Sequence, residues 1–175
     1  LDSIIQKKPR IILLNKCDVA DSQATSIWLK YFRDKGFYAA AVDCRTGKGL
    51  NSFDNLVKQA LKSVIERNDA KGMSGKPLRL MVVGIPNTGK SSFINRMGKN
   101  AKAKVADKAG VTRQNQWFVV GNGIELLDTP GVLWPKFDDP EVGDKLAFIG
   151  SVKDEVTDKE TLACRLLESL AATRP

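Results

Sequence analysis

Apolar residues along the chain follow two spacings, one typical of strands and one typical of helices. Five short runs rich in aliphatic residues predict strands, at residues 10–14, 39–43, 79–84, 116–120 and 124–128. Stretches with helical spacing separate most of them. This alternation predicts an α/β fold with a mainly parallel sheet that helices cover on both faces.

Two helices are predicted between the first three strands. Ser22 is a suitable N-cap, and apolar residues recur at helical spacing after it until Gly36. A second helix follows Asn51, with apolar residues between positions 56 and 65 on one face. The small and polar residues 68–77 then predict a flexible connection to the third strand.

A hairpin and two more helices are predicted in the second half of the chain. The Asn122-Gly123 step between the last two strands favours a tight turn, so these strands should be antiparallel neighbours. Helical patterns follow at 141–149 and 157–172, and a capping box from Thr157 to Glu160 opens the second of them.

Length and composition restrict the class of protein. The 175 residues suffice for one domain with a sizeable core, and 42% hydrophobic with 27% charged residues is typical of a soluble chain. Three cysteines favour a reducing compartment over a disulfide framework. No apolar run approaches the roughly 20 residues needed to cross a bilayer. We therefore expect a cytoplasmic protein that does not bind membranes.

Charge points to the class of partner. The 28 basic and 20 acidic residues leave a net charge of +8, which favours polyanions such as RNA, phosphates or anionic lipid headgroups. Histidine is absent from the sequence, so this chain supplies no imidazole base or ligand. The sequence begins at Leu1 and not at a methionine, and we expect it to be a fragment of a longer protein.

Residues 84–91, GIPNTGKS, match the G-x4-G-K-[ST] phosphate loop between a strand and a helix. Small residues let the backbone curl around a phosphate with its N–H groups pointing inward, whereas the alternative is a glycine turn that binds nothing. Lys90 is expected to reach the β- and γ-phosphates and Ser91 to ligate Mg²⁺. The expected nucleotide contacts are Asn87, Thr88, Gly89, Lys90, Ser91 and Ser92.

Two further segments are candidates for the phosphate end of the site. Asp128-Thr129-Pro130-Gly131 closes the last strand, where Asp128 can hold Mg²⁺ through water and the Gly131 N–H can contact a γ-phosphate. An ordinary turn is the alternative. Thr112, in a basic segment between the two motifs, can ligate Mg²⁺ when a γ-phosphate is present and so form a switch.

Asn15-Lys16-Cys17-Asp18 follows the first strand, as the guanine-reading N-K-x-D motif of GTPases does. Guanine presents N1–H and N2–H₂ side by side, and the Asp18 carboxylate can accept from both, whereas adenine would leave buried polar groups unpaired. We expect Asn15 to tie the loop together and the Lys16 stem to lie over the base. A loop with a helix-capping aspartate is the alternative.

The order of these motifs resembles that of circularly permuted GTPases. In Ras-like proteins the phosphate loop comes first, whereas here NKCD at 15–18 precedes both GIPNTGKS and DTPG at 128–131. The sequence is similar to the ribosome biogenesis GTPase A (YlqF-like) group in Gln116-Trp117 and in DTPGVLWPKF at 128–137. The resemblance extends from about Pro9 to the last helix.

The resemblance implies a second base-binding loop at the end of the second strand. Asp43-Cys44-Arg45 takes the place of the family's S-A-K element, whose backbone N–H caps the guanine O6. Cys44 and Arg45 are therefore expected nucleotide contacts. On this interpretation Cys17 and Cys44 are small residues in nucleotide loops and not metal ligands, and Cys164 packs on the last helix.

The resemblance also implies a Ras-like P-loop NTPase fold, circularly permuted. Residues 1–139 would form the GTPase domain and residues 140–175 the start of a C-terminal helical domain. Ras-like sheets have six strands, and the permuted order places the strand between those at 79–84 and 10–14 upstream of Leu1. A parallel sheet without that middle strand would leave backbone groups unpaired, so we expect an upstream segment to supply it.

Catalysis is expected to depart from that of Ras. Val132 stands where Ras has the glutamine that orients the attacking water, so another group must position it. Asn87 matches an asparagine that ligates K⁺ in related GTPases, although it could also be only a turn-forming residue. Catalytic contributions are expected from Asn87, Lys90, Thr112 and Gly131.

The implied function is slow hydrolysis of GTP to GDP and phosphate by a monomer that uses Mg²⁺. Potassium and a large (50S) ribosomal subunit precursor would stimulate it, with rRNA and ribosomal proteins as partners. The alternatives are a permuted GTPase acting on the small subunit and a P-loop kinase of small molecules, which the base-reading motif disfavours.

Overall fold

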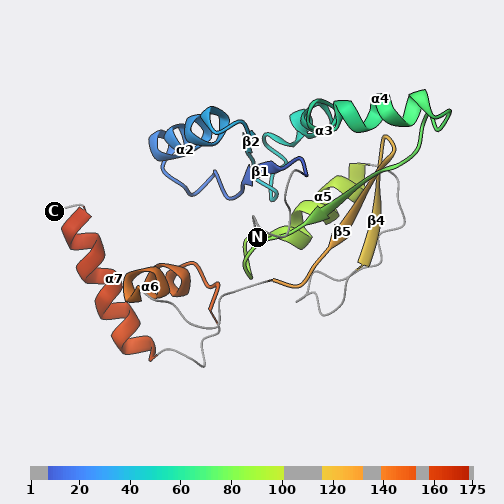
Figure 1. The fold of residues 1–175 in the computed structure, drawn as a ribbon. Coiled ribbons are helices and arrows are strands. Elements are labelled where there is room, and N and C mark those ends of the chain that lie inside the picture. Colours follow the sequence, from blue (N-terminus) through green and yellow to red (C-terminus); the bar gives the residue numbers. More distant parts are fainter. Residues whose placement is uncertain (1–7, 101–115, 132–138, 153–157, 174–175) are drawn as a thin grey trace.

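A computed structural model describes residues 8–100, 116–131, 139–152 and 158–173 (Figure 1). Its strands are β1 (Ile11–Leu14), β2 (Tyr38–Ala41), β3 (Leu78–Val82), β4 (Gln116–Gly121) and β5 (Ile124–Asp128). Its helices are α2 (Ser22–Asp34), η1 (Leu50–Ser52), α3 (Phe53–Ala60), α4 (Lys62–Ala70), α5 (Lys90–Asn100), α6 (Pro140–Phe148) and α7 (Lys159–Thr173). The expected α/β order of elements is confirmed, with strand ends shifted by at most two residues.

The five described strands form two separate sheets. β1 pairs with β2 in parallel, while β5 lies between a parallel β3 and an antiparallel β4, as the hairpin predicts. Within the described part of the chain, β1 and β3 do not hydrogen-bond with each other. The gap between them is the place at which a further strand is expected, and that strand stays a prediction.

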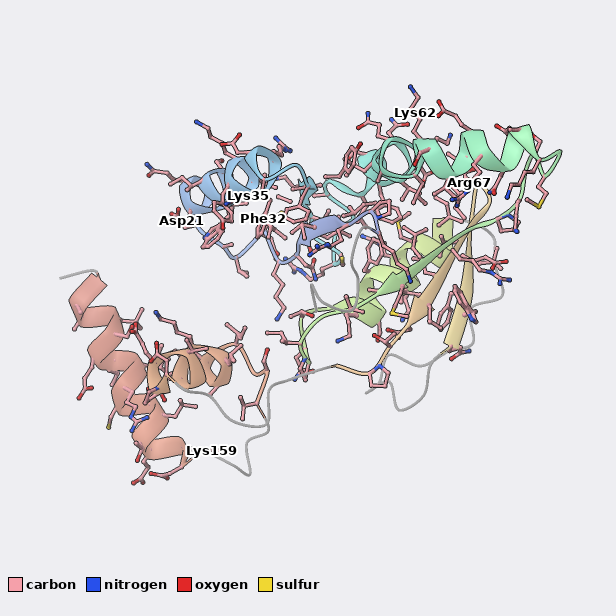
Figure 2. All side chains as sticks on the ribbon, in the orientation of Figure 1. Asp21, Phe32, Lys35, Lys62, Arg67 and Lys159 are labelled. Carbon is pink, nitrogen blue, oxygen red and sulfur yellow. The ribbon has the colours of Figure 1, made fainter. Side chains whose placement is uncertain are left out.

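Helix α2 begins one residue away from the expected cap. Asp21 is the N-cap, since its carboxylate accepts the Ala24 N–H at 2.7 Å, and Ser22 is the first helical residue. Figure 2 labels Asp21 at the start of the helix and Phe32 near its end. Trp28 and Tyr31 contact each other edge to face with ring centroids 5.5 Å apart, yet both stay largely exposed.

The single helix predicted after Asn51 is wrong, because three helical segments replace it. η1 and α3 lead to a break at Leu61, after which α4 runs to Ala70 and takes the first residues of the predicted connection. Helix α3 buries Phe53, Val57 and Ala60, whereas α4 buries no residue. The break therefore lies where the helical segment leaves the core.

The apolar core joins the two sheets. The rings of Phe53 on α3 and Phe93 on α5 meet edge to face with centroids 5.0 Å apart, an arrangement that aromatic pairs favour. Around them lie Val42, Leu50, Val57, Ile94, Met97, Val120, Ile124 and Leu126, all buried. Because α5 follows the phosphate loop and Val42 follows β2, this core fixes the two candidate loops relative to each other.

Helices α6 and α7 pack on each other at one end of the molecule (Figure 1). Arg165 on α7 donates to Asp144 on α6 at 2.8 Å. Asp158 accepts the Thr161 N–H at 3.1 Å at the start of α7, whereas Thr157 of the expected capping box lies outside the described residues. Cys164 is exposed, so its expected packing is wrong. The domain boundary at residue 140 stays a prediction.

A search of the described helices found none with the length and apolar character of a bilayer span.

Candidate nucleotide-binding site

Asn15 joins three loops that are distant in sequence. It follows β1 directly, and its Nδ2 donates to the Thr88 carbonyl of the phosphate loop at 2.7 Å. Its Oδ1 accepts the Cys44 N–H of the second base loop at 3.2 Å. One amide thus uses its donor and its acceptor to hold the two expected base loops against the phosphate loop.

Gly89 makes room for this amide. Its φ of +91° lies in the left-handed region, and a Cβ built on it would run into Asn15 Nδ2. The second glycine of the phosphate loop is thus required twice, once for its backbone conformation and once for the close approach of Asn15.

The loops and helix α5 surround a cleft of about 540 Å³. It is lined by Asn15, Lys16, Asp18, Val19, Asp43, Cys44, Arg45, Gly89, Ser92, Asn95 and Arg96. The sequence analysis named most of these residues. It did not identify Asn95 and Arg96, although the four-residue spacing of Ser92 and Arg96 on α5 places both on one helix face.

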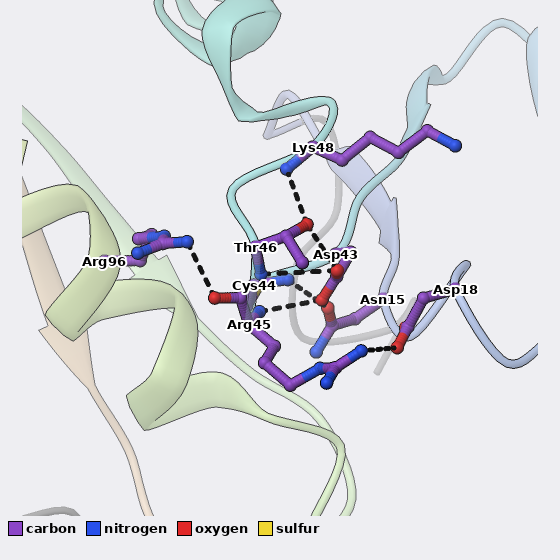
Figure 3. A network of polar contacts seen from close by, with 8 residues as sticks. All are labelled: Asn15, Asp18, Asp43, Cys44, Arg45, Thr46, Lys48 and Arg96. Carbon is purple, nitrogen blue, oxygen red and sulfur yellow. Dashed lines mark hydrogen bonds and ion pairs between the residues drawn. The ribbon is translucent and has the colours of Figure 1, made fainter.

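Asp43 builds the turn of the second base loop (Figure 3). Its carboxylate accepts the Arg45 N–H at 2.8 Å and the Thr46 N–H at 3.3 Å, while the Thr46 hydroxyl donates to it as well. The hydroxyl bond of Thr46 is the main cause that holds the pKa of Asp43 below its ordinary value, and burial opposes it. The residue that replaces the family's serine therefore has a structural role of its own.

Arg45 contacts the carboxylate assigned to the base. Its guanidinium donates to Asp18 Oδ2 at 3.2 Å, and its backbone carbonyl accepts from Arg96 Nη2 at 2.7 Å (Figure 3). The side chain of Arg45 is 79% exposed, whereas that of Asp18 is 23% exposed. The pair links the two base loops, and Arg96 links them to α5.

Lys90 is held beneath the phosphate loop. Its Nζ donates to the carbonyls of Gly84 at 3.1 Å and Ile85 at 3.0 Å, which directs the ammonium group along the inside of the loop. Burial lowers the pKa of Lys90, and the nearby Asp128 carboxylate partly offsets this effect.

Ser91 and Asp128 meet at the end of the phosphate loop. Ser91 Oγ donates to Asp128 Oδ2 at 3.0 Å, and Asp128 is 4% exposed. A hydroxyl and a carboxylate oxygen fit the ligand preference of Mg²⁺, so the donor set suits this ion. Thr129 holds the motif at the end of β3 by donating to the Val82 carbonyl at 2.7 Å. Thr112, the third expected ligand, and Val132 lie outside the described residues.

Cys44 is a poor metal ligand in this setting. It is 6% exposed, and burial raises the pKa of its thiol to about 11. Metals bind the thiolate, so a thiol that keeps its proton fits the expected role as a small residue of the base loop.

Gly131 and Asn87 complete the phosphate end. A Cβ on Gly131 would approach Pro86 to 2.8 Å, so only glycine fits there without a shift of the loop. Asn87, with a φ of 59°, donates through Nδ2 to the Gly150 carbonyl after α6. The structure thus places Gly131 against the phosphate loop, and it connects Asn87 of that loop to the turn after α6, a contact that sequence patterns did not reveal.

This fold with these loops is that of a P-loop GTPase domain in which the Asn15–Asp18 loop precedes the phosphate loop. Residues 79–167, more than half of the chain, match the family described as 50S ribosome-binding GTPase. The chain belongs to that family.

Individual relatives agree. The chain is 47% identical over 177 residues to ribosome biogenesis GTPase A of Priestia megaterium, covering 100% of this chain and 61% of that protein. The crystal structure of GNP-bound YlqF from T. maritima matches with a TM-score of 0.60 at 30% identity, over 93% of this chain and 58% of that one. A GDP-bound YlqF structure matches with a TM-score of 0.58 at 31% identity, over 93% and 59%. The chain spans about three fifths of the length of these relatives.

Proposed function

We propose that the protein binds and hydrolyses GTP. The observation that carries this proposal is the pair of hydrogen bonds made by the Asn15 side chain, to Thr88 at 2.7 Å and to Cys44 at 3.2 Å. They hold the base loops and the phosphate loop around one cleft. A ligand that spans both ends needs a purine base and a chain of phosphates, and Asp18 selects guanine among purines by accepting from N1–H and N2–H₂.

The phosphate end supplies the means to stabilise a transferring phosphoryl group. Lys90 is partly buried and aligned by two carbonyls of its own loop, so its charge is in place for the β- and γ-phosphates. Ser91, Asp128 and Thr112 are the proposed holders of Mg²⁺, which neutralises charge on the phosphates when bound. The Gly131 N–H is the proposed sensor of the γ-phosphate.

The proposed reaction is slow in the isolated protein. Phosphoryl transfer depends on positioning and charge, and the side chain of Val132 has no polar atom that could orient water. We assign the missing charge to potassium held by Asn87, and the remaining acceleration to a partner particle. Equal turnover in sodium and potassium salts would contradict the assignment of potassium to Asn87 and would leave the proposal of GTP hydrolysis intact.

The proposed partner is the precursor of the large ribosomal subunit. We propose that the protein binds it in the cytoplasm as a monomer. Its support is the family, whose description names the 50S ribosome, and the name shared by the curated relatives. The net charge of +8 favours contact with RNA.

The test uses the full-length gene product. Calorimetric titration with GTP, GDP and ATP should show guanine nucleotides bound at least about 100-fold more tightly than ATP, as a site built on base hydrogen bonds discriminates. Turnover should then rise with 50S precursor particles and not with small-subunit particles. Uptake of ATP as readily as GTP would refute the proposal, and stimulation by small-subunit particles alone would favour the alternative partner.

A further inference from the structure

The turn that follows α6 lies against the phosphate loop. Ser151 Oγ donates to the Pro86 carbonyl at 2.9 Å, and Asn87 Nδ2 donates to the Gly150 carbonyl. Ser151 is 4% exposed, so this hydroxyl is buried at its contact. Two adjacent residues of the loop are thus held by two adjacent residues that follow 63 and 65 positions later.

The turn itself is rigidly connected to α6. The Gly150 N–H donates to the Ala147 carbonyl at 2.9 Å, and the Ser151 N–H donates to the Leu146 carbonyl at 2.8 Å. Gly150 has a φ of +69°. These two bonds with a left-handed residue form a Schellman motif, which ends a helix in a defined geometry. A movement of α6 would therefore move Ser151 and Gly150 with it.

Pro86 lies between this turn and the motif that follows β5. On one side its carbonyl accepts from Ser151, and on the other a Cβ on Gly131 would approach its Cα, its nitrogen and its Cγ to 2.8 Å. The backbone of Gly131 therefore lies close to Pro86. A shift of Gly131 toward Pro86 would displace Pro86, and through it the α6 turn.

Asn87 adds a directional effect. The nitrogen and oxygen of an amide share one carbon, so holding Nδ2 at the Gly150 carbonyl also fixes where Oδ1 points. Oδ1 is the atom that a cation would use. Gly150 thus sets the orientation of the residue that is assigned to potassium.

We propose that the α6 turn, residues 149–151, is a positioning element of the phosphate loop and couples α6 energetically to nucleotide binding. This inference rests on the proposed function, because it concerns the same site. Ser151 and Gly150 act through Pro86 and Asn87. Coupling of this kind is reciprocal. The free energy by which bound nucleotide stabilises the contact of the α6 turn with the phosphate loop equals the free energy by which that contact stabilises nucleotide binding.

The test compares Ser151→Ala with Ser26→Ala in the full-length protein. Ser26 is exposed and donates only to the Ser22 carbonyl within α2, so its substitution removes a hydroxyl away from the site. GDP should slow amide hydrogen exchange in α6 of the wild type. In Ser151→Ala the affinity for GDP should fall about 3- to 10-fold and the added protection of α6 should shrink, because a buried hydrogen bond is lost. Ser26→Ala should match the wild type in both measurements.

A second pair of variants addresses the backbone of the turn. No atom of the described residues lies within 4 Å of a Cβ placed on Gly150, so Gly150→Ala strains the φ of +69° without a collision among them. Asparagine tolerates this conformation better. Gly150→Ala should therefore resemble Ser151→Ala, and Gly150→Asn should restore GDP affinity and the protection of α6. Urea unfolding of each variant checks that it is folded.

The outcomes separate the two proposals. Wild-type protein that binds GDP, with unchanged affinity and unchanged α6 protection in Ser151→Ala and Gly150→Ala, would overturn the positioning role and leave the proposed function intact. Wild-type protein that binds neither GDP nor GTP would refute both.

Discussion

The side chain of Asn15 donates to the Thr88 carbonyl at 2.7 Å, although 73 positions separate the two residues. This bond crosses between the sheet of β1 and β2 and the loop that follows β3. Among the described residues no strand of one sheet pairs with a strand of the other. The relative position of the base loop and the phosphate loop is therefore fixed by side-chain hydrogen bonds and by packing in the core.

Asn15→Ala should weaken nucleotide binding and stability together. It removes a donor to Thr88 and an acceptor from Cys44, both partly buried, which we expect to cost about 1–3 kcal/mol in the free energy of unfolding. GDP affinity should fall at least about 10-fold, the equivalent of about 1.4 kcal/mol. Urea unfolding and calorimetry measure both quantities. Asn55→Ala, on the exposed face of α3, is the matched control. Wild-type affinity in Asn15→Ala would contradict the bridging role.

Gly89→Ala should be far more damaging than Gly72→Ala. Both glycines have left-handed backbones, with φ of +91° and +71°, so each substitution carries the same conformational cost of about 1 kcal/mol. The Cβ at Gly89 collides with Asn15, whereas no described atom lies within 4 Å of a Cβ at Gly72. The difference in unfolding free energy between the two variants isolates the collision. Equal losses would show that Asn15 yields without cost.

Asp18→Asn should change the preference for the base. The amide offers a donor where the carboxylate had two acceptors, which suits the C2 carbonyl of xanthine and not the amino group of guanine. Affinity for GDP should fall about 100-fold or more, while affinity for the xanthosine nucleotide should rise. Asp34→Asn, exposed at the end of α2, makes the same change of charge away from the site. Retained GDP preference in Asp18→Asn would remove Asp18 from base recognition.

Lys90→Met should abolish binding of GTP and alter how stability depends on pH. The pKa of Lys90 in the folded protein lies below its ordinary value of 10.5, chiefly through burial. As pH rises toward 10.5, the unfolded chain binds more protons at this residue than the folded one, so the stability of the wild type rises relative to Lys90→Met. Urea unfolding at about pH 7 and about pH 10 measures this difference.

The control for this measurement is Lys58→Met on the exposed face of α3. Its stability relative to the wild type should stay nearly constant over the same range. A constant difference for Lys90→Met as well would mean that burial does not perturb Lys90 in solution.

Local sequence patterns predicted which helices and strands form better than they predicted where a helix is interrupted. The hairpin of β4 and β5 formed where the Asn122-Gly123 step indicated, because a two-residue turn depends on those residues alone. The helix after Asn51 was predicted without its break at Leu61, since apolar spacing continues through α4 although α4 buries no residue. Spacing records which face is apolar and does not record where the core ends.

The base-reading, phosphate-loop and DTPG motifs could be identified from the chain alone, because each needs particular residue types at short spacing to make its contacts. Their order along the chain also indicated the family to which the protein belongs. Only the tertiary structure decided that Asp43 builds the base loop, that Arg45 and Arg96 reach across it, and that the turn after α6 holds Pro86 and Asn87. These contacts join residues far apart in sequence, and their partners are set by how the core packs α3, α5 and the two sheets together.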